Sequence, residues 1–160
     1  MTKRSGFTII EMLIVVSILA LLMAILLPVL EGSWETTRDA RRAADLKSVQ
    51  AALLAYREAN KAYPTTNDQW QGDAPAYGGF GYAGVGYIPG LVPDFLPALP
   101  RDPDPDNPQG DAGYVYRSDG VDYKFMAHKT PLSYPPDSPF LDPARPNDAW
   151  QVSTPGAYLW

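Results

Sequence analysis

The sequence predicts an α+β protein in which a long N-terminal helix packs on a small antiparallel β-sheet with long loops rich in proline and glycine. Three patterns predict this fold: an apolar run over residues 7–30, an amphipathic pattern over residues 38–59, and two strand patterns joined by an Asp-Gly turn within residues 114–127. With 160 residues, the chain has enough length for one compact head and an appendage.

The apolar run, Phe7 to Leu30, is long enough to cross a membrane as a helix. At about 1.5 Å per residue it spans the roughly 30 Å hydrocarbon core of a bilayer. An ordinary secretory signal has an apolar region of only about 7 to 15 residues followed by a small-residue cleavage site, whereas this run is longer and is followed by Glu31. A plain membrane anchor fits the length but explains neither Glu11 nor Pro28.

Glu11 is the residue in the apolar run that most needs a function. A carboxylate at the centre of a membrane helix costs roughly 2.5 to 3.5 kcal/mol on insertion scales, so such residues are usually functional and paired. We therefore expect the Glu11 carboxylate to pair with another group.

Four segments are expected along the chain. They are a short basic leader at 1–6, a membrane-spanning helix at 7–30, an amphipathic continuation of that helix at 31–62 and a globular α+β head at 63–160. In the continuation, apolar residues recur every three or four positions and should face the sheet: Ala43, Leu46, Val49, Leu53 and Tyr56. Pro64 should end the helix.

The expected hairpin places Tyr123, Phe125 and Ala127 on the face that meets the helix. Lys124 and His128 fall on the opposite face, which we expect to be exposed. A short edge strand is expected at residues 149–152.

Composition excludes several classes of function. Cysteine is absent, which excludes disulfides, thiolate zinc sites and a cysteine nucleophile, and the single histidine excludes multi-histidine metal sites. The net charge of −5 argues against a general attraction to nucleic acid. No catalytic constellation with a required spacing is present, so we do not expect an enzyme.

Two further motifs lie in the loops of the head. Residues 79–84 satisfy GxGxxG by letter but lack the strand and helix of a dinucleotide site, so an irregular loop is expected. Asp102, Asp104 and Asp106, with Asp111 following, form a closely spaced acidic group. Such a group is either a calcium site or a solvated acidic loop, and its match to an EF-hand loop is incomplete.

The string from Gly6 to Val16, GFTIIEMLIVV, resembles the processing site and first helix of the type IV pilin superfamily, which includes the type II secretion pseudopilins. The shared features are a basic leader ending in Gly6, Phe7 as first mature residue, Glu11 as the fifth and Pro28 as the twenty-second. This resemblance implies cleavage after Gly6 by a membrane prepilin peptidase and methylation of the amine of Phe7. It also implies that Glu11 meets that amine on a neighbouring subunit during assembly.

The resemblance further implies a structural subunit of a type IV pilus or of a type II secretion pseudopilus, and the sequence leaves both open. The implied partners are copies of the chain, other pilin-like subunits, an assembly platform and an ATPase. The head would lie outside the cytoplasmic membrane. The family's use of calcium in cysteine-free heads favours Ca²⁺ at the acidic group, although no cofactor is certain.

A second hypothesis is a minor pilin at a filament tip, acting in adhesion or DNA uptake. The acidic composition argues against the DNA version, and no nucleic-acid partner is expected.

Overall fold

A computed structural model of the chain describes residues 7–78 and 86–160, without the side chains of residues 28–33. The chain forms two compact units, Met1–Thr37 and Arg38–Trp160. Gly6 and the GxGxxG segment at 79–84 lie outside the described residues. The α+β class predicted from the sequence is confirmed, because one long helix is accompanied by a four-stranded antiparallel sheet.

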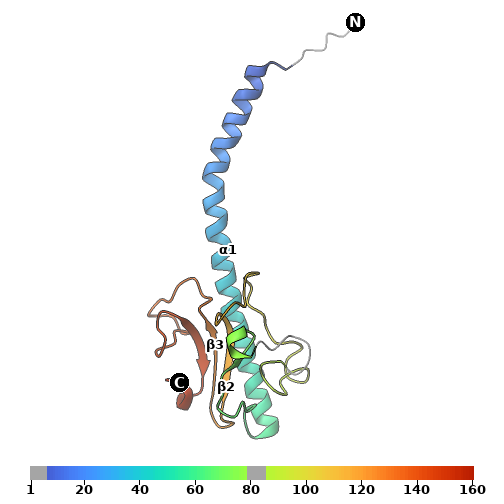
Figure 1. The fold of residues 1–160 in the computed structure, drawn as a ribbon, viewed down its shortest axis with the longest axis vertical. Helices are drawn as coiled ribbons and strands as arrows, with labels where there is room; N and C mark the ends of the chain where they lie inside the picture. The colour runs from blue at the N-terminus through green and yellow to red at the C-terminus, as the bar shows by residue number, and fades with distance from the viewer. Residues whose placement is uncertain (1–6, 79–85) are drawn as a thin grey trace. The chain divides into compact units, whose positions relative to one another are not determined.

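Helix α1 runs over Ile9–Asn60, a length of 52 residues, and its range includes Pro28. The helix ends as Lys61 adopts a left-handed backbone with φ 63°, while its N–H donates to the carbonyl of Arg57 at 2.7 Å. Pro64 follows and prevents a return to helix, as the sequence predicted. The first unit consists of the N-terminal part of this helix (Figure 1).

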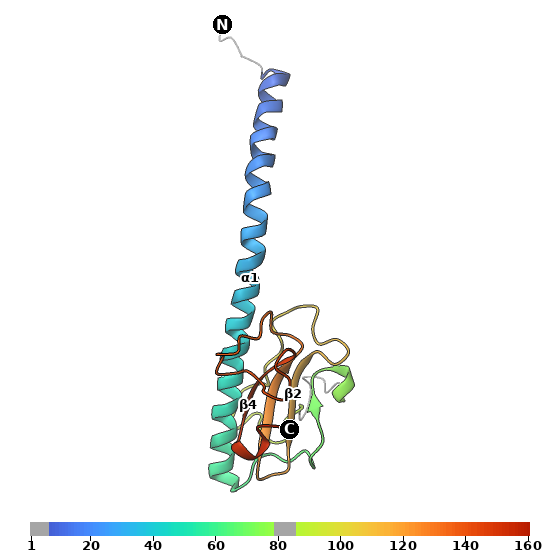
Figure 2. The same ribbon diagram turned by 90° about the vertical axis from the view of Figure 1, so that its left-hand side faces the viewer.

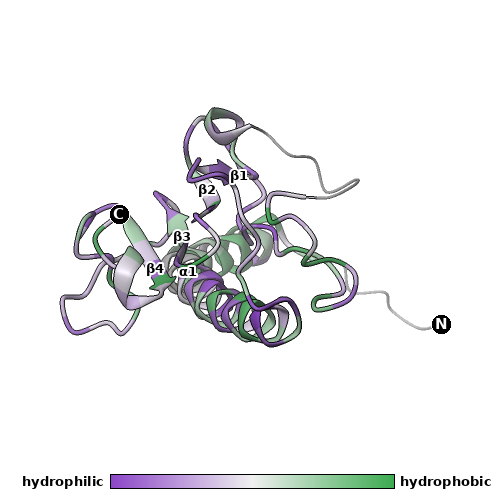
Figure 3. Cartoon of the chain, turned by 90° about the horizontal axis from the view of Figure 1, so that it is seen from below, coloured by the Kyte–Doolittle hydropathy of each residue, from purple (hydrophilic) through white to green (hydrophobic). Residues whose placement is uncertain are grey.

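The second unit contains the sheet and the C-terminal turns of α1. Its strands are β1 (Gln71–Gly72), β2 (Gly113–Ser118), β3 (Tyr123–His128) and β4 (Ala149–Ser153). They pair antiparallel in the order β1-β2-β3-β4, so β1 and β4 are the edges, and Figure 3 shows them side by side in that order. Two short 3₁₀ turns, η1 (Pro75–Tyr77) and η2 (Pro155–Ala157), follow the edge strands.

The hairpin between β2 and β3 forms where the Asp-Gly signal predicted it. Ser118 pairs with Tyr123 at its end. In the turn, one carboxylate oxygen of Asp119 accepts the N–H groups of Val121 and Asp122, both at 2.8 Å, and Gly120 takes φ 96°. A positive φ of this kind favours glycine, which explains the residue at this position.

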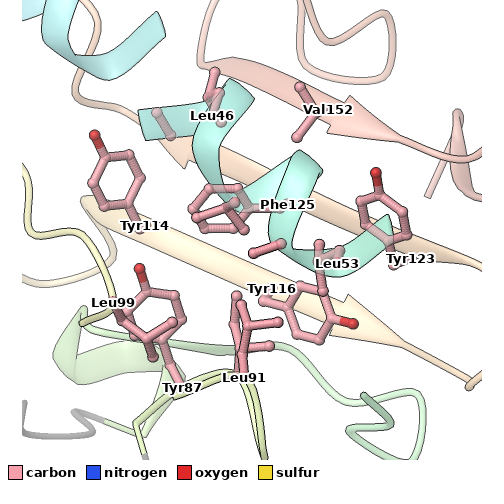
Figure 4. Close-up of a cluster of buried hydrophobic side chains, with 14 of the residues drawn as sticks. Leu46, Leu53, Tyr87, Leu91, Leu99, Tyr114, Tyr116, Tyr123, Phe125 and Val152 are labelled. Carbon is pink, nitrogen blue, oxygen red and sulfur yellow. The ribbon is translucent and has the colours of Figure 1, made fainter. Parts of the chain in front are cut away.

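The core of the second unit lies between α1 and one face of the sheet (Figures 2 and 4). Of the predicted helix stripe, Leu46, Val49 and Leu53 are fully buried, and Ala43 and Tyr56 pack against them at the margin. The sheet contributes aromatic side chains to this core, including Tyr114, Tyr116, Tyr123 and Phe125. A loop covers the remaining side with Tyr87, Ile88 and Leu91. The predicted inward face of the hairpin is thus confirmed.

The expected exposure of the opposite sheet face is wrong. Lys124 is completely buried and His128 retains only 7% exposure. The face is covered because Trp70 and Tyr77 pack on Val115, Met126 and Ala149, which form a second apolar cluster. Alternation along a strand identifies which residues share a face, but it does not say whether loops cover that face.

Candidate processing and assembly site

The N-terminus of α1 is closed by a reciprocal cap between Thr8 and Glu11. The backbone N–H and the hydroxyl of Thr8 both donate to Oε2 of Glu11, at 2.8 and 2.7 Å, and the N–H of Glu11 donates back to the Thr8 hydroxyl at 3.3 Å. This is the capping-box arrangement, in which a threonine before the first turn and a glutamate three residues later satisfy donors that the helix leaves free. Sequence reasoning missed it, although the Thr-x-x-Glu spacing is its signature.

This cap changes the interpretation of Glu11. The apolar run predicted an unpaired carboxylate at Glu11, but in the isolated chain Oε2 accepts two hydrogen bonds. The other oxygen, Oε1, accepts no hydrogen bond from the residues that the structure describes. A carboxylate can accept at both oxygens, so Glu11 keeps the capacity for a further donor.

The helix that follows the cap exposes its whole apolar circumference. Ile9–Leu27 is long and apolar enough to cross a membrane, with mean hydropathy 2.9 and no burial of the segment within the chain. Side chains around the helix are open, with 86% of Ile9 and 64% of Val16 exposed. A helix that is apolar on every side needs an apolar surrounding, which a bilayer or a bundle of similar helices supplies.

Within the acidic group of the head, Asp102 forms a buried ion pair with Arg42 of α1. Arg42 donates through Nε to Oδ2 of Asp102 at 2.8 Å and through Nη2 to Oδ1 at 2.7 Å. Burial by itself lowers the pKa of Arg42, but the hydrogen bonds and charges of Asp102 and Asp39 outweigh burial and raise it. Burial also acts to raise the pKa of Asp102, yet the bonds from Arg42 and from the Asp104 N–H hold it below its usual value. Both groups are therefore charged at neutral pH.

The four predicted metal ligands are not brought together. Asp104 lies 3.4 Å from Arg38, and Asp111 pairs with Lys129 at 2.7 Å on the surface. The backbone N–H of Asp106 donates a hydrogen bond to the carboxylate of Asp104 at 3.2 Å. Within residues 7–78 and 86–160, no group of three or more acidic or histidine side chains is arranged to hold a metal ion. This donor set does not fit calcium, and we assign no calcium site.

A second buried ion pair lies under the covered face of the sheet. Lys124 donates to Asp142 at 2.9 Å, and both side chains are fully buried. The ammonium group also donates to the carbonyl oxygen of Trp160 at 2.9 Å. Burial lowers the pKa of Lys124, and the hydrogen bond that Lys124 donates to Asp142 only partly offsets this effect. No sequence pattern predicted that the two residues would meet.

Comparison with known proteins places the capped, apolar N-terminus in a class. Residues 1–27 match the family model described as the prokaryotic N-terminal methylation motif. The N-terminal segment therefore carries this motif, and the recognition of a type IV pilin-like N-terminus is confirmed.

Curated relatives extend the match beyond the motif. The chain is 36% identical over 67 residues to type II secretion system core protein G of Vibrio cholerae, covering 42% of this chain and 46% of the relative. It is 38% identical over 64 residues to the Pseudomonas aeruginosa protein, covering 40% and 45%, and 34% identical over 65 residues to the Escherichia coli protein, covering 41% and 45%. This homology is consistent with the type IV pilin superfamily.

The matches to the curated relatives cover only part of this chain and part of each relative. The alignments span slightly less than half the length of the curated relatives. No solved structure matches the chain. The relatives are named as core proteins of a secretion system, which agrees with the prediction that this chain is no enzyme.

Proposed function

We propose that the chain is a structural subunit of a type II secretion pseudopilus, processed at its N-terminus and polymerised through α1. The observation that carries the proposal is Glu11, placed one turn after Phe7 in a methylation motif and held with one carboxylate oxygen free for a new donor. Homology to core protein G favours the pseudopilus over an extended pilus.

Cleavage between Gly6 and Phe7 would create a donor for Oε1 of Glu11. The freed and methylated amine of Phe7 is a cation, and the amine of a neighbouring subunit is the natural partner for a carboxylate in an apolar environment. Because Thr8 binds Oε2 only, Oε1 can accept the amine while the cap stays intact. An ion pair between packed apolar helices costs free energy whenever it is broken, so it sets the axial register between subunits.

Before assembly, the apolar helix would hold the subunit in the cytoplasmic membrane, with the head on the outer side. The side chains of Ile9–Leu27 are solvent-exposed in the isolated chain, and they would lie in lipid first and against other helices later. Both environments are apolar, so the transfer has no large hydrophobic driving force. The work of extraction must therefore come from an assembly ATPase acting through a membrane platform.

Replacing Glu11 with alanine tests the proposal. The E11A chain should insert in the membrane normally, since removing a carboxylate from an apolar helix eases insertion. Filament formation, measured by shearing and sedimentation of assembled subunits in cells with the complete secretion machinery, should be lost. Normal filaments from E11A would refute the role of Glu11.

Thr8→Ala is the matched control because it removes the hydroxyl of the cap but keeps the carboxylate. Loss of a capping hydroxyl costs about 1 kcal/mol of helix stability. We expect T8A filaments in near-normal amounts. Equal defects in T8A and E11A would instead mean that the cap, and not a bond between subunits, is what assembly requires.

A further inference from the structure

A cavity of about 580 Å³ lies beside the edge strand β4 in the second unit. One wall comes from the proline-rich loop at 136–143, including Pro139 and Phe140, and another from Val152 and Ser153 of β4. Lys47 and Gln50 of α1 form a third side. The volume falls in the range of ligand-binding pockets in proteins.

The strand beside this cavity has free hydrogen-bonding groups. Beyond the end of β4, the N–H of Thr154 donates to the carbonyl of Tyr123 in β3 at 3.1 Å. In an antiparallel ladder the residues that bond a given neighbour alternate. The backbone groups of Gln151 and Ser153 therefore point away from β3, toward the open side of the sheet.

The first half of this edge is already covered by the segment at residues 140–142, which forms an isolated β-bridge between Leu141 and Trp150. The N–H of Gln151 donates to the carbonyl of Phe140 at 2.6 Å, and that of Asp142 donates to the carbonyl of Ala149 at 3.1 Å. This segment stops pairing with β4 at Pro139, because proline has no N–H to donate. The N–H of Phe140 donates to the hydroxyl of Ser138 at 3.3 Å and not to β4.

Beyond that point the edge is open. The carbonyl of Gln151 and both backbone groups of Ser153 have no hydrogen-bond partner among the residues that the structure describes. The side chain of Gln151, with 3% exposure, also buries an Oε1 that lacks a partner within that part of the chain. Unpaired strand edges are templates for another extended chain.

The cavity carries one sign of charge. Lys47 is the charged side chain in its lining, and its ammonium lies 5.6 Å from the centre of the Phe140 ring. Lys47 has no ion-pair partner in the described ranges 7–78 and 86–160. A carboxylate is the complementary group.

We propose that this open edge docks a short extended segment of another polypeptide, which adds as a strand beside Val152 and Ser153 and places an acidic side chain near Lys47. Backbone hydrogen bonds to an edge supply affinity in such complexes, and side-chain pockets supply specificity. This docking role goes beyond the filament function and does not depend on the assembly contact of Glu11.

Three synthetic peptides, blocked at both ends, test the proposal with the full ¹⁵N-labelled chain in detergent micelles. The first alternates valine and threonine around a central glutamate, and the second has lysine in place of glutamate. The third repeats the first with alternate backbone nitrogens methylated, which removes ladder donors but keeps side chains and charge. Binding is followed by the amide resonances of the chain.

The glutamate peptide should shift the amide resonances of Gln151 and Ser153 saturably. The lysine and N-methylated peptides should bind at least about tenfold more weakly, which corresponds to about 1.4 kcal/mol. In the variant Lys47→Glu the preference between glutamate and lysine peptides should reverse. Lys61→Glu, which changes the net charge equally at the end of α1, should leave the preference unchanged.

If the N-methylated peptide bound as tightly as the unmethylated glutamate peptide, strand addition would be overturned, because binding in the cavity would then not need the backbone N–H groups. Saturable shifts confined to other surfaces would also overturn the proposal. So would the absence of saturation with the glutamate peptide at concentrations up to about 5 mM, where even weak complexes form.

Discussion

The guanidinium of Arg42 and the carboxylate of Asp102 form a bidentate ion pair whose side chains are 3% and 0% exposed. The two residues are 60 positions apart, so the pair fixes the loop at 102–104 to the helix that carries the head. Arg42 also donates to Asp39 at 2.8 Å, and Asp39 accepts the N–H of Leu132. The network therefore ties two distant loops to one turn of α1.

Breaking this pair should destabilise the head strongly. Asp102→Asn leaves the buried guanidinium without its main counter-charge, and removing one partner of a buried pair costs about 3 to 5 kcal/mol. Near-ultraviolet circular dichroism of the full chain in detergent during urea unfolding measures the change. Lys129→Gln, which breaks an exposed pair with Asp111, should cost less than about 1 kcal/mol. Similar losses in both variants would contradict the structure.

The same pair predicts how stability depends on acidity. The pKa of Asp102 is lower in the folded chain than in the unfolded chain, because the bonds from Arg42 and Asp104 outweigh the opposing effect of burial. The unfolded state therefore binds the proton first as the pH falls. The contribution of Asp102 is present above the ordinary aspartate value of about 3.9 and is lost as the pH drops through the lowered folded value.

Melting temperatures of the wild-type chain and of Asp102→Asn between about pH 6 and pH 2 test this dependence. The gap between the two proteins should be largest above about pH 4 and should narrow below it. A gap that stays constant through the acid range would show that Asp102 keeps the same pKa in both states.

The acidic group at residues 102–111 should not bind calcium. The four acidic residues of the sequence motif do not converge, and Asp102 and Asp111 are each paired with a basic side chain. We expect the melting temperature of the head to be the same in excess calcium and in excess chelator. A rise of several degrees with calcium alone would contradict the placement of these carboxylates.

The second buried pair, Lys124 and Asp142, should behave as a coupled unit. Lys124→Met leaves Asp142 buried with Arg145 at 3.2 Å as its remaining cation, and should cost about 3 kcal/mol. Adding Asp142→Asn removes the uncompensated charge. A double-mutant cycle by urea unfolding should therefore give a coupling of at least about 1 kcal/mol. Strictly additive effects would mean that the two charges do not interact.

Local patterns predicted much of this fold. The stripe of Leu46, Val49 and Leu53 has helical spacing, and the Asp119-Gly120 turn has a short-range chemical signature, so both could be read from neighbouring residues. Glu11 and its motif were also visible locally. The Thr8 cap had a readable local signal as well, which is the Thr-x-x-Glu spacing.

Long-range contacts could not be predicted in this way. Nothing near Arg42 or Lys124 indicates partners 60 and 18 positions away, because ion pairs across loops leave no periodic trace. The outer sheet face was expected to be exposed because Lys124 and His128 are polar. Met126 lies between them on the same face, and its partner Val115 in β2 is also apolar, so these two residues were local signs of a second apolar layer.

Mass spectrometry of the mature N-terminus tests whether a prepilin-type cut frees the amine of Phe7, which would then become the partner of Glu11 on a neighbouring subunit. In cells with an active prepilin peptidase, we expect a chain that begins at N-methylated Phe7. A chain that keeps residues 1–6 under those conditions would contradict this expectation, because the amine for Glu11 would not exist.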